Sequence, residues 1–146
     1  MAVKTESVGK RYPPTAYEVG LEKVREFATV TAEENPVYHD REAAKAAGFR
    51  DVVAPPMFAV VYSAPALGPA VFDPDVGINF ATMVHGGQEF IWSEPVCVGD
   101  VVETTAGVLE VFEKGGNGFY VFESVSINHD GAEVVRGKWT NIVRGV

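Results

Sequence analysis

A stretch without charged residues runs from Val52 to Phe72 and constrains the fold more than any other feature of the chain. Its 21 residues would suffice for a membrane-spanning helix, which needs about 20 apolar residues. Four prolines interrupt it, and each removes a backbone N–H from the helix. Lipid offers no donor to the carbonyl that would be left unpaired. The stretch is therefore predicted to form a helix buried in protein. Its prolines are Pro55, Pro56, Pro65 and Pro69, and the longest segment between them is Met57–Ala64.

The buried helix is predicted to extend from Met57 to Leu67. Pro56 suits its first turn, where a missing N–H removes no hydrogen bond, and Gly68-Pro69 is expected to end it. Because this helix is apolar on nearly every side, other elements must surround it.

The second half of the chain is predicted to supply these elements as β-strands. Its segments are rich in Val, Ile, Phe, Tyr, Trp and Thr, which favour strands. The connections 114–118 and 128–131 contain Gly and Asn, which tolerate the positive φ of hairpin turns. We therefore expect antiparallel pairing, with His85 in a loop just before the first strand. The expected strands are Glu89–Trp92, Asp100–Glu113, Gly118–Asn128 and Glu133–Val143.

Two shorter helices are predicted before the apolar stretch. Apolar residues recur at helical spacing from Leu21 to Thr31. Asp40 is placed to cap a second helix that extends through Ala47 and ends at Gly48. Helices followed by long antiparallel strands indicate an α+β class, with a sheet curled around the apolar helix. Residues 1–146 are expected to form a single domain of this kind.

The charge balance and the single cysteine exclude several function classes. Lys and Arg number 12 and Asp and Glu number 20, so the net charge is −8, which disfavours nucleic acid and anionic membranes as partners. Cys97 alone allows no internal disulfide and no Cys-x-x-Cys metal motif. The charged segment Met1–Arg11 lacks the apolar core of a signal peptide. We expect a cytoplasmic protein without metal or cofactor.

Five short motifs in a fixed order resemble the MaoC-like hydratase and dehydratase family, in its N-terminal MaoC-like domain type. The resemblance extends over about residues 8–143. It implies the hot-dog fold, in which an antiparallel sheet wraps a central helix, and pairing into dimers through the sheets. The motifs are Glu33-Glu-Asn-Pro-Val-Tyr-His-Asp40, Gly48-Phe49 with Val52-Val-Ala-Pro-Pro-Met-Phe58, Val84-His-Gly-Gly-Gln-Glu-Phe90, Glu94-Pro-Val with Val98-Gly-Asp100, and Asn128-His-Asp-Gly131.

The chemistry implied by this resemblance is reversible hydration of a trans-2-enoyl thioester to the (3R)-hydroxyacyl thioester, on coenzyme A or acyl carrier protein. Such a reaction needs a base for the C2 proton, an acid for the departing 3-hydroxyl, and donors to the thioester oxygen. Catalytic members carry Asp-x-Asn-Pro-x-His for the first two tasks. A glycine N–H at the start of the hot-dog helix performs the third.

This sequence departs from that pattern at each of these positions. Aligned on Asn35-Pro36, the Asp position holds Glu33, the His position holds Tyr38, and His39 comes one residue late. The helix-start glycine aligns with Pro56, which has no N–H to donate. Loss of one such donor typically costs about 10²–10³ in rate.

These departures, together with the resemblance, indicate the non-catalytic subunit of a two-chain (3R)-hydroxyacyl-ACP dehydratase of fatty-acid elongation. The partner chain would carry the Asp/His dyad, and this chain would contribute binding of the acyl chain. Two alternatives stay open. One is a self-sufficient homodimeric (R)-specific hydratase that uses His39 and Glu33, and the other is a non-enzymatic protein that binds acyl thioesters. The expected partners are acyl-CoA or acyl-ACP and a second MaoC-like chain, identical or dyad-bearing.

The candidate site residues follow from the same comparison. His39 and Glu33 are the candidate catalytic pair, with Asn35 more typical of a turn residue beside them. Arg41 and Lys45 lie one helical turn apart and could contact a phosphate group of the carrier. The other candidates for substrate binding are Tyr38 and, on the apolar helix, Pro56, Met57, Phe58, Val61 and Tyr62.

Overall fold

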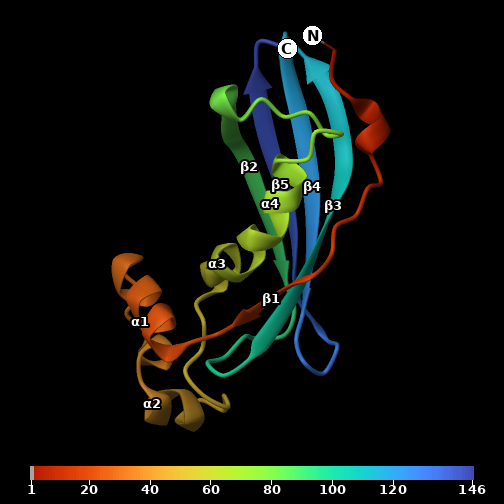
Figure 1. Ribbon diagram of the computed structural model, residues 1–146. Coiled ribbons are helices and arrows are strands. Elements are labelled where there is room, and N and C mark those ends of the chain that lie inside the picture. Colours follow the sequence, from red (N-terminus) through yellow and green to blue (C-terminus); the bar gives the residue numbers. More distant parts are fainter. Residues whose placement is uncertain (1) are drawn as a thin grey trace.

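The computed structural model describes residues 2–146, which form one antiparallel sheet with helices on one face (Figure 1). Five strands of the described chain follow one another across the sheet in the order β1-β3-β4-β5-β2. β2 is thus an edge strand, with β5 on one side and no strand of this part of the chain on the other. The strands are β1 (Thr15–Glu18), β2 (Met83–Trp92), β3 (Val101–Lys114), β4 (Asn117–Ile127) and β5 (Glu133–Arg144).

Four short helical segments follow one another without a break and together cross one face of the sheet (Figure 1). We call residues 56–71 the central helix; it comprises η3 (Pro56–Phe58), α3 (Ala59–Ser63), η4 (Ala64–Leu67) and α4 (Gly68–Val71). No helix within residues 2–146 has the length and apolar character needed to span a membrane. The other helical segments are η1 (Thr5–Ser7), α1 (Leu21–Val30), η2 (Pro36–Tyr38), α2 (Arg41–Ala46) and η5 (Phe80–Thr82).

The predicted end of the central helix at Gly68-Pro69 is wrong, because the helical turns continue to Val71. Gly68 has helical dihedral angles, φ −50° and ψ −52°, and its carbonyl accepts a hydrogen bond from Phe72 N at 3.1 Å. Pro69 lies in the first turn of α4, a position where the absent N–H removes no hydrogen bond. The prolines therefore divide the helix into short α and 3₁₀ segments instead of ending it.

Buried hydroxyl groups connect the central helix to the sheet just before Pro65. The hydroxyl of Thr104 on β3 lies 3.5 Å from the carbonyl oxygen of Tyr62. Thr104 Oγ1 is also 2.7 Å from Ser126 Oγ on β4, which in turn is 3.2 Å from Ser63 Oγ. These three buried hydroxyls thus satisfy one another inside the molecule and connect the helix to β3 and β4.

Small side chains let the central helix approach the sheet closely. Ala59, Ser63, Ala66 and Ala70 recur every three or four residues and are fully buried. Aromatic side chains of the sheet, including Phe122 and Trp139, belong to the same buried cluster as Ala66 and Ala70. The prediction of an apolar helix wrapped by an antiparallel sheet is therefore confirmed.

The remaining helix predictions are also confirmed. Leu21 begins α1, and Asp40 caps α2 by accepting a hydrogen bond from Ala43 N at 2.9 Å. Gly48 adopts the expected positive φ, +95°, after α2. Figure 1 shows that α1 and α2 lie beyond the start of the central helix, at the end of the molecule away from the chain termini.

Two parts of the sheet differ from the prediction. The short strand β1 was not predicted, and β2 begins at Met83, so His85 lies in a strand and not in a loop. Two glycines follow His85. Because glycine is depleted in strands, the sequence pattern does not predict this part of β2. Gly86 is needed there, since a Cβ atom at this position would lie 2.5 Å from the side chain of Ile142. The pairing with β5 is irregular between His85 and Gly87.

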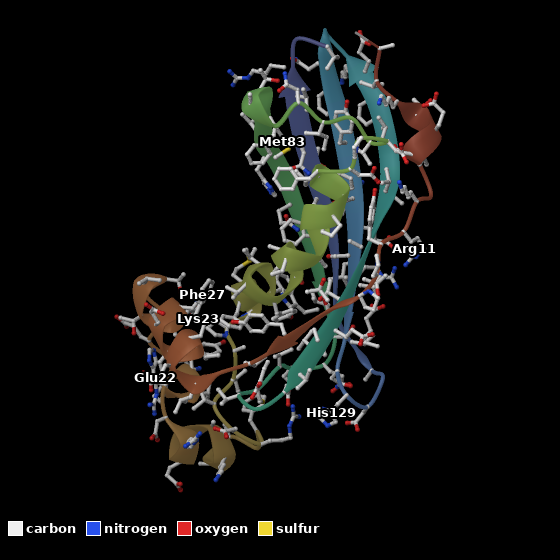
Figure 2. All side chains as sticks on the ribbon, viewed as in Figure 1. Arg11, Glu22, Lys23, Phe27, Met83 and His129 are labelled. Carbon is white, nitrogen blue, oxygen red and sulfur yellow. The ribbon has the colours of Figure 1, made fainter. Side chains whose placement is uncertain are left out.

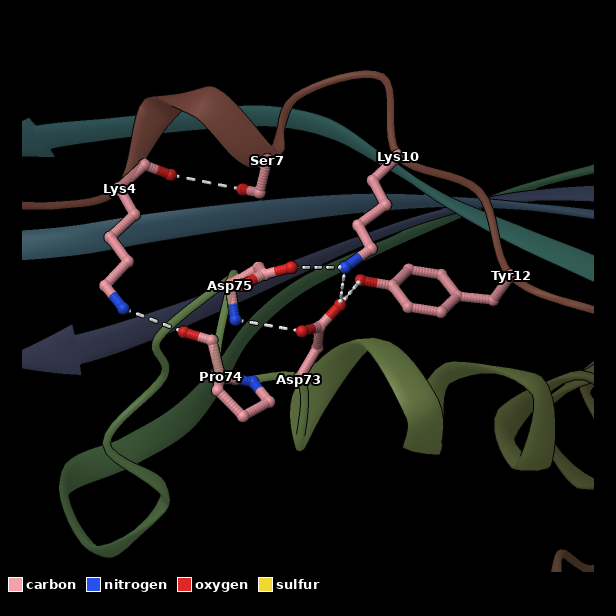
Figure 3. A network of polar contacts seen from close by, with 7 residues as sticks. All are labelled: Lys4, Ser7, Lys10, Tyr12, Asp73, Pro74 and Asp75. Atoms are coloured by element: carbon pink, nitrogen blue, oxygen red, sulfur yellow. Dashed lines mark hydrogen bonds and ion pairs between the residues drawn. The ribbon is translucent and has the colours of Figure 1, made fainter.

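A polar network fastens the N-terminal segment to the loop after the central helix (Figure 3). Lys10 Nζ lies 2.6 Å from Asp73 Oδ2 and 2.9 Å from Asp75 Oδ2. The Tyr12 hydroxyl donates to the same Asp73 oxygen at 2.7 Å. We call these four residues the N-terminal clasp. Its hydrogen bonds from Lys10 and Tyr12 lower the pKa of Asp73 to about 2.

We expect the substitution Asp73→Asn to lower the thermal midpoint at pH 7 by a few degrees. A carboxyl group whose pKa is lowered by folding stabilises the folded state above its unfolded pKa of about 4, and this contribution is lost as the pH falls toward 2. The difference between the two proteins should therefore shrink between pH 4 and pH 2 in melts followed by circular dichroism. Asp130→Asn, on an exposed loop, is the control. Equal midpoints of wild type and Asp73→Asn at pH 7 would contradict the prediction.

Candidate functional site

A cavity of about 210 Å³ lies at the start of the central helix. Backbone hydrogen bonds bring its walls together from distant parts of the chain. Val53 N donates to Val37 O at 2.9 Å, and Ala54 N donates to Val96 O at 2.8 Å. The cavity is lined by Tyr38, Val53, Ala54, Pro55, Pro56, Tyr62, Trp92, Ser93, Glu94, Pro95 and Val96.

The start of the central helix borders this cavity through Pro55 and Pro56, neither of which has a backbone N–H. Pro56 has no N–H, as the sequence requires, and its carbonyl accepts a hydrogen bond from Trp92 Nε1 at 2.8 Å. This bond also fixes the indole ring of Trp92 against the cavity. The helix start therefore differs from one that offers a glycine N–H to a ligand.

His39 is not among the lining residues; its neighbour Tyr38 is. His39 Nε2 lies 2.5 Å from the carbonyl oxygen of Glu33, a geometry in which the ring nitrogen carries the proton and donates. Arg25 Nε donates to the carbonyl of His39 at 2.9 Å and holds the same loop against α1. His39 and Glu33 are thus brought together through the Glu33 backbone. Their catalytic role stays a prediction.

Neither of the other two histidines lines this cavity. His85 lies on β2, where its ring makes an edge contact with Trp139 at a centroid distance of 6.1 Å. His129 lies in the loop between β4 and β5 (Figure 2). The described residues also contain no group of three or more His, Cys, Asp or Glu side chains arranged to hold a metal ion.

Asn35 and the two basic candidates lie outside the cavity wall. Asn35 Oδ1 accepts a hydrogen bond from Val37 N at 3.1 Å, so its side chain caps η2. Arg41 Nε forms an ion pair with Asp51 at 3.0 Å, on an exposed part of α2. Lys45 is exposed and forms no ion pair within residues 2–146.

The candidates on the central helix point in different directions. Phe58 is fully buried and packs edge-on against Phe27 of α1, at a centroid distance of 5.4 Å. Met57 is 48% exposed, and Val61 borders a separate groove beside α1. Tyr62 and Pro56 are the candidates on this helix that line the cavity.

Sequence reasoning missed the wall formed by the end of β2 and the loop that follows it. Trp92, Ser93, Glu94, Pro95 and Val96 all border the cavity. In the sequence, the segment Glu94-Pro-Val indicates only a resemblance to the family. Its place opposite the helix start depends on the bridge between Val53 and Cys97, which no local pattern predicts.

Comparison with known proteins shows the family to which this chain belongs. The family model described as "FAS1-like, dehydratase domain region" matches residues 6–136. The chain belongs to the MaoC-like dehydratase family. Curated relatives in this family include a UPF0336 protein of Saccharopolyspora erythraea, 41% identical over 99% of this chain and 94% of the relative. A UPF0336 protein of Clavibacter michiganensis is 43% identical over 99% of this chain and 98% of its own.

Solved structures of MaoC-like proteins share the fold. A chain of the C-terminally truncated HadBC complex, a 3R-hydroxyacyl-ACP dehydratase from Mycobacterium tuberculosis, superimposes with a TM-score of 0.81 at 28% identity. The alignment covers 96% of this chain and 99% of that chain. R-hydratase PhaJ1 from Pseudomonas aeruginosa gives a TM-score of 0.74 at 20% identity, over 99% of this chain and 88% of that chain. These similarities confirm the α+β hot-dog fold and a hydro-lyase family of the MaoC type.

Proposed function

We propose that this MaoC-like chain is a subunit of a (3R)-hydroxyacyl-thioester dehydratase or trans-2-enoyl hydratase of cytoplasmic acyl metabolism, such as fatty-acid elongation. In this proposal the chain binds the acyl part of the substrate, and a partner chain carries the Asp/His dyad. One observation carries it: Tyr38 lines the cavity at the position of the family histidine, while His39 donates to the Glu33 carbonyl outside it. A phenol is a poor replacement for an imidazole as general base.

The edge strand β2 supports a partner chain. Its outer edge carries unpaired backbone groups, which favour pairing with another strand. Ile91 is 65% exposed, and Trp92 and Val84 are exposed as well. Beyond the start of β2, the exposed rings of Phe72 and Phe80 contact each other at a centroid distance of 5.2 Å. An edge with this much apolar surface favours burial against a second chain.

A partner on this edge would also border the cavity. Trp92 is the last residue of β2 and at the same time part of the cavity wall. A second MaoC-like chain paired along β2 would therefore place its own residues near the substrate site. The HadBC structure, in which a similar chain is part of a complex, is consistent with such an arrangement.

Enoyl-thioester hydration tests the proposal directly. The purified chain should show no turnover above background, whereas its mixture with a dyad-bearing MaoC-like chain from the same genome should turn over substrate at ordinary enzymatic rates. Loss of the enoyl absorbance of crotonyl-CoA and of longer trans-2-enoyl thioesters provides the measurement. The partner alone is the control. Full activity of this chain by itself, free of any co-purifying protein, would overturn the proposal.

A further inference from the structure

We propose that the hydroxyl of Tyr62 donates a hydrogen bond to an uncharged carbonyl oxygen of a ligand bound in the cavity at the start of the central helix. The ligand class is an acyl thioester, and this part of the inference rests on the proposed function. In this role Tyr62 is a binding residue that takes the place of the missing helix-start donor.

The position of the Tyr62 hydroxyl supports this role. Tyr62 is 3% exposed and is one of the residues that line the cavity. Within residues 2–146 its hydroxyl oxygen has no hydrogen-bond partner. Among these residues, the only side-chain polar atoms that are fully enclosed and have no partner are the two amide atoms of Gln88. The Tyr62 hydroxyl is thus not fully enclosed. The hydroxyl oxygen therefore faces open space, and the cavity is the space that Tyr62 lines.

The backbone of the cavity wall offers few other donors, and the remaining lining hydroxyls are those of Tyr38 and Ser93. Pro55, Pro56 and Pro95 have no N–H groups, and the N–H groups of Val53 and Ala54 are already bonded to backbone carbonyls. The indole N–H of Trp92 is bonded to Pro56 O. The Tyr62 hydroxyl, which has no partner among the described residues, is therefore free to donate to a ligand in the cavity.

The surroundings favour a neutral ligand over an anion. Most of the lining residues are apolar, and the only charged residue among them is the acidic Glu94. The chain as a whole carries a net charge of −8. Burial raises the pKa of Tyr62 above its ordinary value, so the phenol stays protonated at neutral pH and donates without acting as a base. No histidine of the described chain lines this cavity, so we expect this chain alone to hold the ligand without turnover.

Binding of crotonyl-pantetheine labelled with ¹³C at the thioester carbonyl tests the inference on the full chain. Tyr62→Phe removes the hydroxyl and keeps the ring, and Tyr120→Phe, at a buried tyrosine that does not line this cavity, is the matched control. We expect Tyr62→Phe to weaken binding about five- to tenfold, as loss of one hydrogen bond does, and Tyr120→Phe to change it less than twofold. Calorimetry measures the affinities, and thermal melts check that both variants fold.

The carbonyl stretching band of the bound ligand provides a second measurement. In the wild type this band should lie at lower frequency than in Tyr62→Phe, and its position should not change between pH 6 and pH 9. No binding to the wild type, equal binding to Tyr62→Phe, or the same band in both proteins would each overturn the inference. The turnover of the mixed enzyme tests the proposed function separately, so the two can fail independently.

Discussion

Replacing Phe58 by alanine should lower the free energy of unfolding by about 3–5 kcal/mol, the usual cost of removing a buried phenylalanine side chain. Phe58 is fully buried, and its ring contacts those of Phe27, Tyr17 and Tyr62. It therefore joins α1 and β1 to the central helix. The loss would be measured by urea denaturation followed by tryptophan fluorescence and far-UV circular dichroism.

The adjacent residue supplies the control for this experiment. Met57 lies on the same helical turn but is 48% exposed. Met57→Ala should change stability by no more than about 0.5 kcal/mol, which is typical of surface substitutions. Similar losses in the two variants would show that Phe58 is not the main link between these elements. We also expect Phe58→Ala to weaken ligand binding in the cavity, because Phe58 supports the ring of Tyr62.

In the mixture of this chain with a dyad-bearing partner, His39→Ala should leave kcat/KM within about twofold of the wild type. Replacing the dyad histidine of the partner by alanine should lower kcat/KM by about 10²–10⁴. The reason is the position of His39, whose Nε2 donates to the Glu33 carbonyl outside the cavity. Steady-state hydration kinetics of both mixtures, at matched concentrations, measure the effect.

Glu33→Gln provides a second variant in the same experiment. Its backbone carbonyl still accepts from His39, so the loop is retained while the carboxylate is removed. We expect no loss of kcat/KM from this change. A decrease of about a hundredfold or more in either variant would favour the alternative in which this chain is a self-sufficient hydratase using His39 and Glu33.

The parts of the fold that were predictable from sequence are those specified by local patterns. The cap at Asp40 and the antiparallel hairpins each depend on a few neighbouring residues. The end of the central helix was mispredicted because glycine and proline usually stop a helix, whereas here Pro69 begins a new turn. The strand around His85 was missed because Gly86 is required by the side chain of Ile142, a contact distant in sequence.

The candidate site was less accessible to sequence reasoning than the fold. Alignment on Asn35-Pro36 placed Tyr38 at the family position, and Tyr38 does line the cavity. The wall at Trp92 and Glu94 could not be inferred, since it depends on pairing between segments more than 40 residues apart, such as Val53 with Cys97. The hydrogen bond of His39 to a backbone carbonyl likewise has no signature in the sequence.

The division of the central helix by Pro65 and Pro69 also bears on the order of folding. A peptide of residues 56–71 would nucleate poorly, because nucleation needs consecutive N–H donors and each proline removes one. We therefore expect the isolated segment to be unstructured in water. The sheet, with its long-range strand pairing, must form at least in part before the helix becomes stable. Folding should accordingly be slow for a chain of this size, with the helix acquired in the last cooperative step.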